Sequence, residues 1–223
     1  MPFSGMAVSG KIVDLRNLLA ERFPHTPRAA AARLATGLTA LDSMIGGGLP
    51  KGAITELISP QLSTGSASLI AALLQAAQRD RYFLALIDGR DSFDPQPLGN
   101  ACLRHLLWAR CGQALEAVKA ADLLLRDGNF PLLILDVALN SPNELRKIPQ
   151  TSWYRLQRLV ENTSSAFLVV SRRSMVSSAK LKVVLENTRT WPGWEQENAL
   201  SHLQIRIHRA SLTGGETTEA KAS

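Results

Sequence analysis

Apolar residues gather in short runs along the middle of the chain, and longer amphipathic stretches separate these runs. Pro131–Val137 has the unbroken apolar character of a strand covered on both faces, and the short runs all predict strands. They are Ala53–Ile58, Tyr82–Asp88, Leu106–Cys111, Pro131–Val137 and Ala166–Ser171, and the alternating run Leu203–His208 predicts a more exposed strand. The separating stretches predict helices at Ser66–Gln78, Gly112–Arg126 and Trp153–Glu161. Strands that alternate with helices form βαβ units, so the pattern predicts an α/β fold with three layers and a mostly parallel central sheet flanked by helices.

The chain divides into three parts by its patterning. Residues 1–33 hold an amphipathic helix and a linker, residues 34–210 hold the core domain, and residues 211–223 are a Gly-, Thr- and Glu-rich tail expected to be disordered. One core domain is the simplest interpretation for 223 residues.

The N-terminal helix precedes the core and carries Leu15 and Leu19 at helical spacing, with Phe23 close behind. Two interpretations remain open. The helix packs on its own core domain, or it is an interface for a second copy or a partner. We favour self-association or partner docking, because the core pattern leaves no obvious room for this helix.

The beginning of the core carries an ordered series of motifs. Residues 35–58 read ATGLTALDSMIGGGLPKGAITELI, and Asp94-Pro95 follows the second predicted strand. This series resembles the RecA family, in which a Thr-Gly-x-x-x-Leu-Asp segment precedes a Gly-Gly-Leu-Pro turn, a strand and a phosphate-binding loop. The matching positions are Thr36, Gly37, Leu41, Asp42, Gly47, Gly48, Leu49, Pro50 and Gly52. An unrelated tight turn before a strand is the alternative, but it leaves the order of the other matches unexplained. The resemblance spans about residues 35–171 and implies a RecA-like core.

The phosphate-binding loop is where the chain departs from that family. Such loops follow the pattern Gly-x-x-x-x-Gly-Lys-Ser/Thr, in which backbone amides and the lysine bind phosphate and the hydroxyl binds magnesium. The chain has Ser59 at the first glycine, Gly65 at the lysine and Ser66 at the hydroxyl position. No lysine occurs between Lys51 and Lys119. The sequence therefore predicts a loop that does not support ATP hydrolysis.

Two further positions bear on the same chemistry. The resemblance places a catalytic Glu shortly after the second strand, and this chain has Arg90 there, whose guanidinium is not a general base. The neighbouring Asp91 is a conceivable substitute. Asp136 ends a strand where the family has its magnesium-linked Asp. We expect no catalytic residue, no metal and no resident cofactor, with weak binding of ATP and magnesium left open at a degenerate site of Ser59, Gly65, Ser66 and Asp136.

Charge and cysteine content narrow the setting. The formal net charge is +6, which is compatible with an acidic partner such as nucleic acid but also with no anionic partner. Two cysteines are too few for a disulfide framework, so a reducing cytoplasm is the expected compartment. Apolar stretches fall short of the roughly 20 residues of a membrane span, so no membrane association is expected.

The resemblance also implies where DNA is contacted. RecA-like proteins use loops after the fourth and fifth strands, which correspond to residues 139–150 and 172–182. The candidate contacts in these loops are Arg146, Lys147, Arg172, Arg173, Lys180 and Lys182. Cations among small hydroxyl residues suit phosphate contacts and a mobile loop, and a solvated surface loop is the open alternative. Trp191 and Trp194 either stack on bases or a partner, or pack over the sheet edge, which we favour.

The run Leu106-Leu107-Trp108-Ala109-Arg110 precedes an Ala- and Leu-rich helix. It is similar to a run in the ImuA group, which are RecA-like accessory proteins of bacterial translesion-synthesis mutagenesis cassettes. The resemblance implies a role in the SOS response to DNA damage. Its implied partners are single-stranded DNA, an inactive Y-family polymerase homologue (ImuB-like) and a RecA-type recombinase. Trp108 is equally explained as a core aromatic residue.

Two alternative functions remain open. One is an active DNA-dependent ATPase of the recombinase class with an unorthodox phosphate loop. The other is a pure protein-interaction module, such as a cell-division inhibitor.

Overall fold

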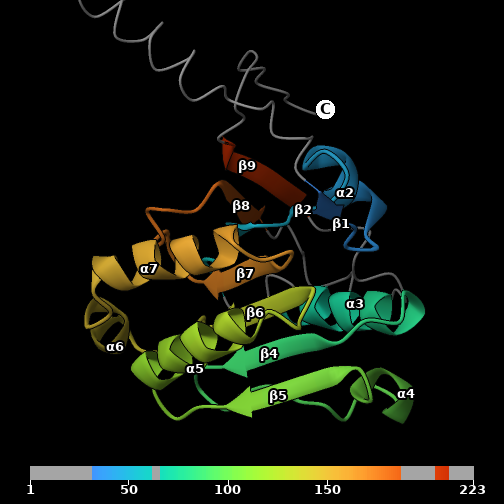
Figure 1. Cartoon of the computed structure of the whole chain (residues 1–223), viewed down its shortest axis with the longest axis horizontal. Helices are drawn as coiled ribbons and strands as arrows, with labels where there is room; N and C mark the ends of the chain where they lie inside the picture. The colour runs from blue at the N-terminus through green and yellow to red at the C-terminus, as the bar shows by residue number, and fades with distance from the viewer. Residues whose placement is uncertain (1–31, 62–65, 187–203, 211–223) are drawn as a thin grey trace, which may run out of the picture. The chain divides into compact units, whose positions relative to one another are not determined.

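A computed structural model of the chain describes residues 32–61, 66–186 and 204–210 (Figure 1). The chain divides after residue 31 into two units, and the described residues all belong to the second. The predictions for Leu15, Leu19, Phe23, Gly65, Trp191, Trp194 and the tail lie outside the described residues.

A seven-stranded sheet forms the centre of the fold, in the order β5-β4-β6-β7-β3-β8-β9 (Figure 1). The strands are β3 (Ala53–Ile58), β4 (Leu84–Asp88), β5 (Leu106–Arg110), β6 (Leu132–Asp136), β7 (Ala166–Ser171), β8 (Leu181–Glu186) and β9 (Gln204–Ala210). All neighbours pair in parallel except β8 and β9, which are antiparallel. β6 and β7 lie between the consecutive strands β3 and β4. The predicted mostly parallel α/β sheet is therefore confirmed.

Helices cover both faces of the sheet. α5 (Ala114–Asp127) and α7 (Gln150–Glu161) lie side by side over one face, as Figure 1 shows, and α3 (Ser66–Arg79) and α4 (Asn100–Leu103) cover the other. Side chains alternate along each strand, so one strand feeds two cores. On β4, Leu84 and Leu86 join the core under α3, whereas Ala85 and Ile87 join the core under α5 and α7. This double coverage explains why the central strands β4, β6 and β7 are almost wholly apolar.

The motif series before the first core strand builds a small cap. It comprises β1 (Arg33–Leu34), α2 (Thr39–Met44) and β2 (Leu49–Pro50), which pairs with β1. The Asp42 carboxylate accepts hydrogen bonds from the Thr36 amide (3.0 Å) and hydroxyl (2.8 Å). A side chain at Gly48 would collide with the Leu34 carbonyl, and the φ of Gly48 is 126°. These motif residues thus shape the chain locally.

The structure also differs from the sequence-based expectations. β8 was not predicted, because Lys180 and Lys182 made its start look like an exposed loop. The predicted loop 139–150 contains a short helix, α6 (Pro142–Arg146), which begins at the N-cap Ser141. The Ser141 hydroxyl accepts a hydrogen bond from the Glu144 amide, as N-cap side chains do.

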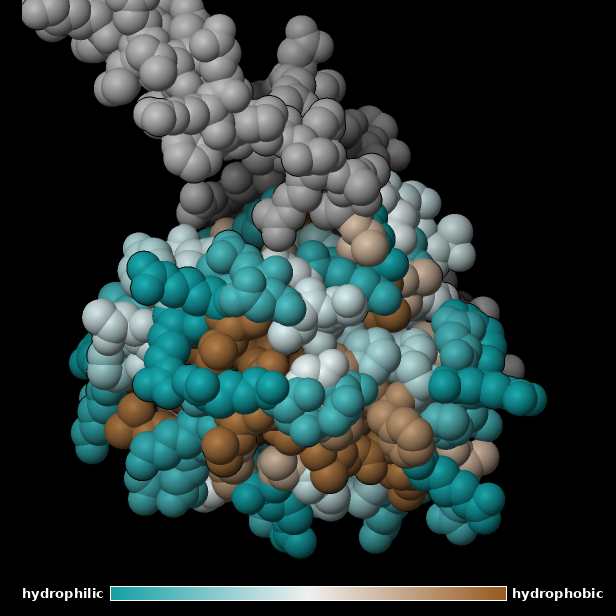
Figure 2. All heavy atoms as spheres, in the orientation of Figure 1, coloured by the Kyte–Doolittle hydropathy of each residue, from teal (hydrophilic) through white to brown (hydrophobic). Residues whose placement is uncertain are grey.

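The visible surface of the core is uneven. Figure 2 shows hydrophilic residues over α7 and hydrophobic residues gathered around α5 and towards β5, where Leu107, Leu115 and Leu123 are exposed. Among the described helices, none combines the length and the apolar character needed to span a membrane.

Candidate nucleic-acid interface

The carboxyl ends of four parallel strands form one edge of the sheet. The Ser59 amide, just after β3, donates to the Ser171 carbonyl at the end of β7 (2.7 Å). The Val137 amide, just after β6, donates to the Val170 carbonyl (3.0 Å). Asp88 of β4 is the register partner of Asp136 of β6. This edge, where open α/β sheets bind ligands, therefore brings together the predicted residues Ser59, Asp136, Arg90 and Arg172.

The phosphate-loop position begins at this edge. Ser59 is buried, and Ser66 is the first residue of α3. A helix N-terminus offers backbone amides to an anion, and Ser66 also retains the hydroxyl of the phosphate-loop pattern. The residues between Gln61 and Ser66 lie outside the part of the chain that the structure describes.

Asp136 is held in an environment unfavourable to its charge. Burial, together with the negative charge of Asp88, raises its pKa to about 6, although a hydrogen bond from the Ala138 amide (2.9 Å) opposes this shift. Asp88 has hydrogen-bond partners in the turn that follows it. Its carboxylate accepts hydrogen bonds from the amides of Ser92 and Phe93 (2.7 Å each), so it caps the turn after β4.

Arg90 stands where the catalytic Glu was expected. Its guanidinium Nη1 lies 3.7 Å from Oε1 of Glu144 in α6. Asn140 donates to both Glu144 Oε2 (2.8 Å) and the Gly89 carbonyl (2.7 Å), and its hydrogen bond holds the pKa of Glu144 below its usual range. The turn after β4 is therefore joined to α6 and the residues before it by a charge pair and hydrogen bonds. Arg90 itself has no carboxylate that could activate water.

Asp91, the conceivable substitute base, is already engaged. Arg110 donates from Nε and Nη2 to its two carboxylate oxygens at 2.6 and 2.7 Å. These hydrogen bonds lower the pKa of Asp91, which makes it a weaker base. The Arg110 guanidinium also lies 4.9 Å from the centroid of the Trp108 ring, and Trp108 meets Phe93 edge-on at 5.4 Å.

The six candidate DNA contacts separate into three groups. Arg172 and Arg173 follow β7 at the carboxyl edge, and Arg146 and Lys147 end α6, which follows the same edge of β6. Three of these four residues are exposed and Arg172 is partly exposed. They form no ion pair with any residue that the structure describes. We call these four residues the carboxyl-edge cations.

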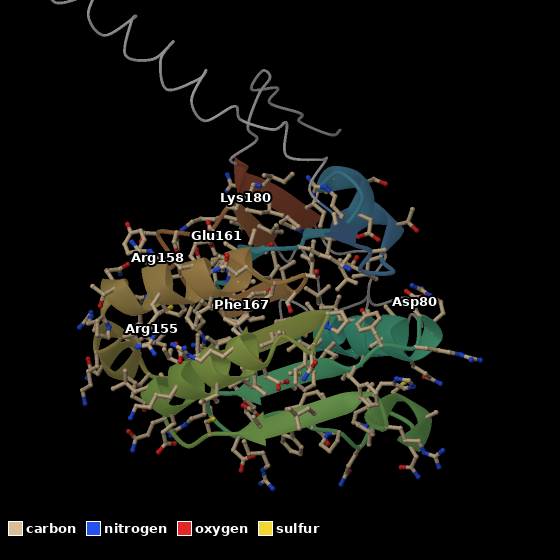
Figure 3. The ribbon with its side chains drawn as sticks, viewed as in Figure 1. Asp80, Arg155, Arg158, Glu161, Phe167 and Lys180 are labelled. Carbon is tan, nitrogen blue, oxygen red and sulfur yellow. The ribbon has the colours of Figure 1, made fainter. Side chains whose placement is uncertain are left out.

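Lys180 lies elsewhere. Its amide donates to the Ile54 carbonyl near the start of β3 (2.9 Å), and Ile54 and Ser59 are separated by about 16 Å of strand. In Figure 3, Lys180 is seen near Arg158 and Glu161 of α7.

Lys182 corrects the expectation of a loop cation. It belongs to β8, its side chain is 9% exposed, and its Nζ lies 2.7 Å from Oε2 of Glu56. A buried, paired ammonium is not available to a phosphate, so we exclude Lys182 from the interface. The pattern misled because Lys182 closely follows a segment rich in serines and cations, which resembles a surface loop.

Comparison with known proteins fits this architecture. Residues 22–149 match the RecA N-terminal domain family. The chain belongs to the RecA family. It is 35% identical over 119 residues to Protein RecA of Clavibacter michiganensis subsp. michiganensis, which covers 52% of this chain and 32% of that protein. It is 26% identical over 212 residues to Protein RecA of Chlamydia trachomatis serovar D, which covers 86% of this chain and 58% of that protein. The matched segments thus span 32% to 58% of the length of these relatives.

The residues of this RecA-like edge do not fit magnesium and ATP as a phosphate loop holds them. The loop has no lysine, Arg90 is directed to Glu144, and Asp136 has a pKa raised by burial. Within the described ranges, no group of three His, Cys, Asp or Glu is placed to hold a metal ion.

Sequence reasoning missed three residues that shape this edge, namely Glu56, Asn140 and Glu144. Glu56 carried a usable signal, because it is a charge inside the apolar strand Ala53–Ile58 and a buried charge requires partners. Asn140 and Glu144 carried no such signal, because polar residues after a strand are ordinary.

Proposed function

We propose that this RecA-family chain is a non-catalytic scaffold that binds single-stranded DNA at the carboxyl edge of its sheet. The observation that carries the proposal is the pairing of Arg90 with Glu144 at the place where the water-activating carboxylate was expected. The lost lysine of the phosphate loop supports it, because phosphate charge then lacks its usual neutralising partner.

The carboxyl-edge cations support the DNA-binding part of the proposal. Arg146, Lys147, Arg172 and Arg173 lie on segments that follow the same edge, and such cations bind a nucleic-acid backbone by releasing its counterions. The curated relatives are named RecA, and a role in DNA repair is carried to this chain as part of the proposal.

The finer role that we propose is that of an ImuA-like accessory protein in SOS-induced translesion mutagenesis. It would act in the cytoplasm with an ImuB-like inactive polymerase homologue and a RecA-type recombinase, and it would associate with itself or a partner through its N-terminal helix. The support is the run Leu106–Arg110 and the degenerate phosphate loop. Co-purification of the full chain with each partner, with and without Leu15→Asp and Leu19→Asp, tests this role.

Binding of a fluorescent single-stranded oligonucleotide across a salt series tests the main proposal. Arg172→Ala with Arg173→Ala is expected to weaken binding and to reduce the salt slope by about one to two. Arg104→Ala with Lys119→Ala removes the same charge from exposed positions before β5 and β6, neither of which forms an ion pair within the described residues, and is the matched control. Equal losses of affinity in the two variants would show that binding depends on net charge and not on the carboxyl-edge cations. No binding by the wild type at low salt would favour a protein-interaction module.

Phosphate release with and without single-stranded DNA tests the absence of catalysis. We expect no turnover above background for the wild type. DNA-stimulated turnover that is lost in Asp136→Asn would show an active ATPase of the recombinase class and would overturn the proposal.

A further inference from the structure

A buried charge cluster underlies the segment 172–180 that joins β7 to β8. Glu56, in the middle of β3, is fully buried, and its Oε1 accepts hydrogen bonds from the amides of Met175 (2.6 Å) and Val176 (2.9 Å). Because β3 lies between β7 and β8, this segment must cross over β3. The carboxylate therefore holds the middle of the crossover from below.

Lys182 completes the cluster from the adjacent strand. It is the register partner of Glu56, and its ammonium contacts Glu56 Oε2 (2.7 Å) and donates to the Ser174 hydroxyl (2.6 Å). A buried ion pair is often no more stabilising than an apolar pair of the same volume, because both charges lose their hydration. A gain in folding stability therefore does not by itself account for the Glu56–Lys182 pair. Its clear structural effect is that it holds the backbone of the crossover in place.

The rest of the segment is anchored in the same way. The Ser171 hydroxyl donates to the Arg173 carbonyl (3.0 Å), and the Ser178 hydroxyl donates to the Trp153 carbonyl of α7 (3.2 Å). Val176 and Ala179 are buried in the core under α5 and α7. The serines that suggested a mobile phosphate-binding loop thus form hydrogen bonds within the protein itself.

We propose that Glu56 is a positioning residue that fixes Arg172 and Arg173 at the carboxyl edge, so that the DNA-binding surface is preformed and needs no nucleotide. The inference rests on the proposed DNA-binding function. Its physical basis is that a crossover whose backbone amides are already held by hydrogen bonds to Glu56 loses less conformational entropy when its cations bind an anionic chain.

Two double variants separate the clamp from general packing. Glu56→Leu with Lys182→Met removes both charges and leaves the amides of Met175 and Val176 without an acceptor. Glu56→Gln with Lys182→Met also removes both charges but keeps an amide oxygen as acceptor. The second variant is therefore the conservative rescue of the first.

Amide hydrogen exchange measures the clamp without any ligand. In the leucine variant, exchange at Met175 and Val176 is expected to speed up by about tenfold or more, because their bonds to Glu56 are lost. Leu133 and Ile134 in β6 are expected to keep their protection, and the glutamine variant should resemble the wild type. Unchanged exchange at Met175 and Val176 in the leucine variant would overturn the clamp. Should that variant fail to fold, exchange faster than that of the wild type at these amides in the glutamine variant would overturn it.

Binding of a single-stranded oligonucleotide then tests the consequence. We expect about a tenfold weaker affinity in the leucine variant, near wild-type affinity in the glutamine variant, and a change of less than about twofold when magnesium and ATP are added to the wild type. Wild-type affinity in a leucine variant with accelerated exchange would overturn the positioning role. A tenfold rise with nucleotide would overturn preformation. A wild type that does not bind at low salt defeats the proposed function and this surface with it, while the exchange result still reports on the clamp.

Discussion

Two regions of the molecule use their charged residues differently. One is the set of carboxyl ends of β3, β4 and β6, and the other is the crossover above β3. At the strand ends, three side chains at or beside the positions expected for phosphate chemistry are engaged elsewhere or electrostatically disfavoured. Arg90 pairs with Glu144, Asp91 pairs with Arg110, and Asp136 has a pKa raised to about 6. At the crossover, Glu56 and Lys182 are buried and their charges are matched by an ion pair and hydrogen bonds.

This difference separates chemistry from shape. A catalytic site requires particular residues to face one ligand atom, and replacement of any of them removes the function. A shaped surface only requires that the backbone be held, and several hydrogen bonds can share that task. The proposed scaffold function requires only that the RecA-like edge of this chain keep its shape.

The largest expected effect comes from breaking the crossover pair on one side. Lys182→Met leaves the Glu56 carboxylate buried without its cation, and we expect a loss of about 3–5 kcal/mol in the free energy of unfolding. Urea denaturation measures it. Glu56→Gln with Lys182→Met should recover more than half of this loss. If the single variant costs no more than the double variant, the two charges are not coupled and the contrast between the two regions fails.

At the strand ends, removal of a charge is expected to raise the free energy of unfolding instead of lowering it. The pKa of Asp136 rises from 3.8 to about 6 on folding, so the ionised carboxylate destabilises the fold increasingly as the pH rises from about 4 to 6. Asp136→Asn is therefore expected to stabilise the protein by about 1–3 kcal/mol above pH 7 and by little below pH 4. Thermal unfolding at several pH values, in a chelator, measures this effect. A variant that is destabilised at pH 8 would show that the charge of Asp136 has a partner.

A tight turn at the strand ends gives a smaller effect. A Cβ at Gly89 would lie 2.5 Å from Asn140 Oδ1 and 2.9 Å from the Asp136 carbonyl. Gly89→Ala is expected to cost about 1–2 kcal/mol of unfolding free energy in chemical denaturation. Gly99→Ala is the control, because nothing lies within 4 Å of its Cβ position, and it should change stability by less than about 0.5 kcal/mol. Equal costs would mean that the turn after β4 is loosely packed.

The smallest expected effect is on catalysis. Arg90→Glu returns a carboxylate to the expected place of the water-activating residue, but the loop still lacks its lysine. We expect no phosphate release above background, with or without DNA. Turnover in this variant would show that one substitution alone separates the chain from an ATPase.

The sequence by itself determined the core strands and their coverage. Five runs became β3, β4, β5, β6 and β7, and all but the edge strand β5 are buried on both faces, which leaves them no exposed polar face. It also determined that the phosphate-loop position has no lysine, because residue identity does not depend on tertiary contacts.

Only the tertiary structure decided where the charged residues are used. Lys182 read as a loop cation and is a buried strand residue, whereas Lys180, two positions earlier, lies away from Arg172 and Arg173. The physical reason is that burial and pairing of a charge depend on the neighbouring strand. Glu56 is opposite Lys182 only because the segment 172–180 crosses over β3 and the chain then returns beside β3 as β8. The local sequence shows the spacing of hydrophobic residues and the residues that favour turns. The order of the strands is a property of the whole fold, and it is this order that brings distant charges together.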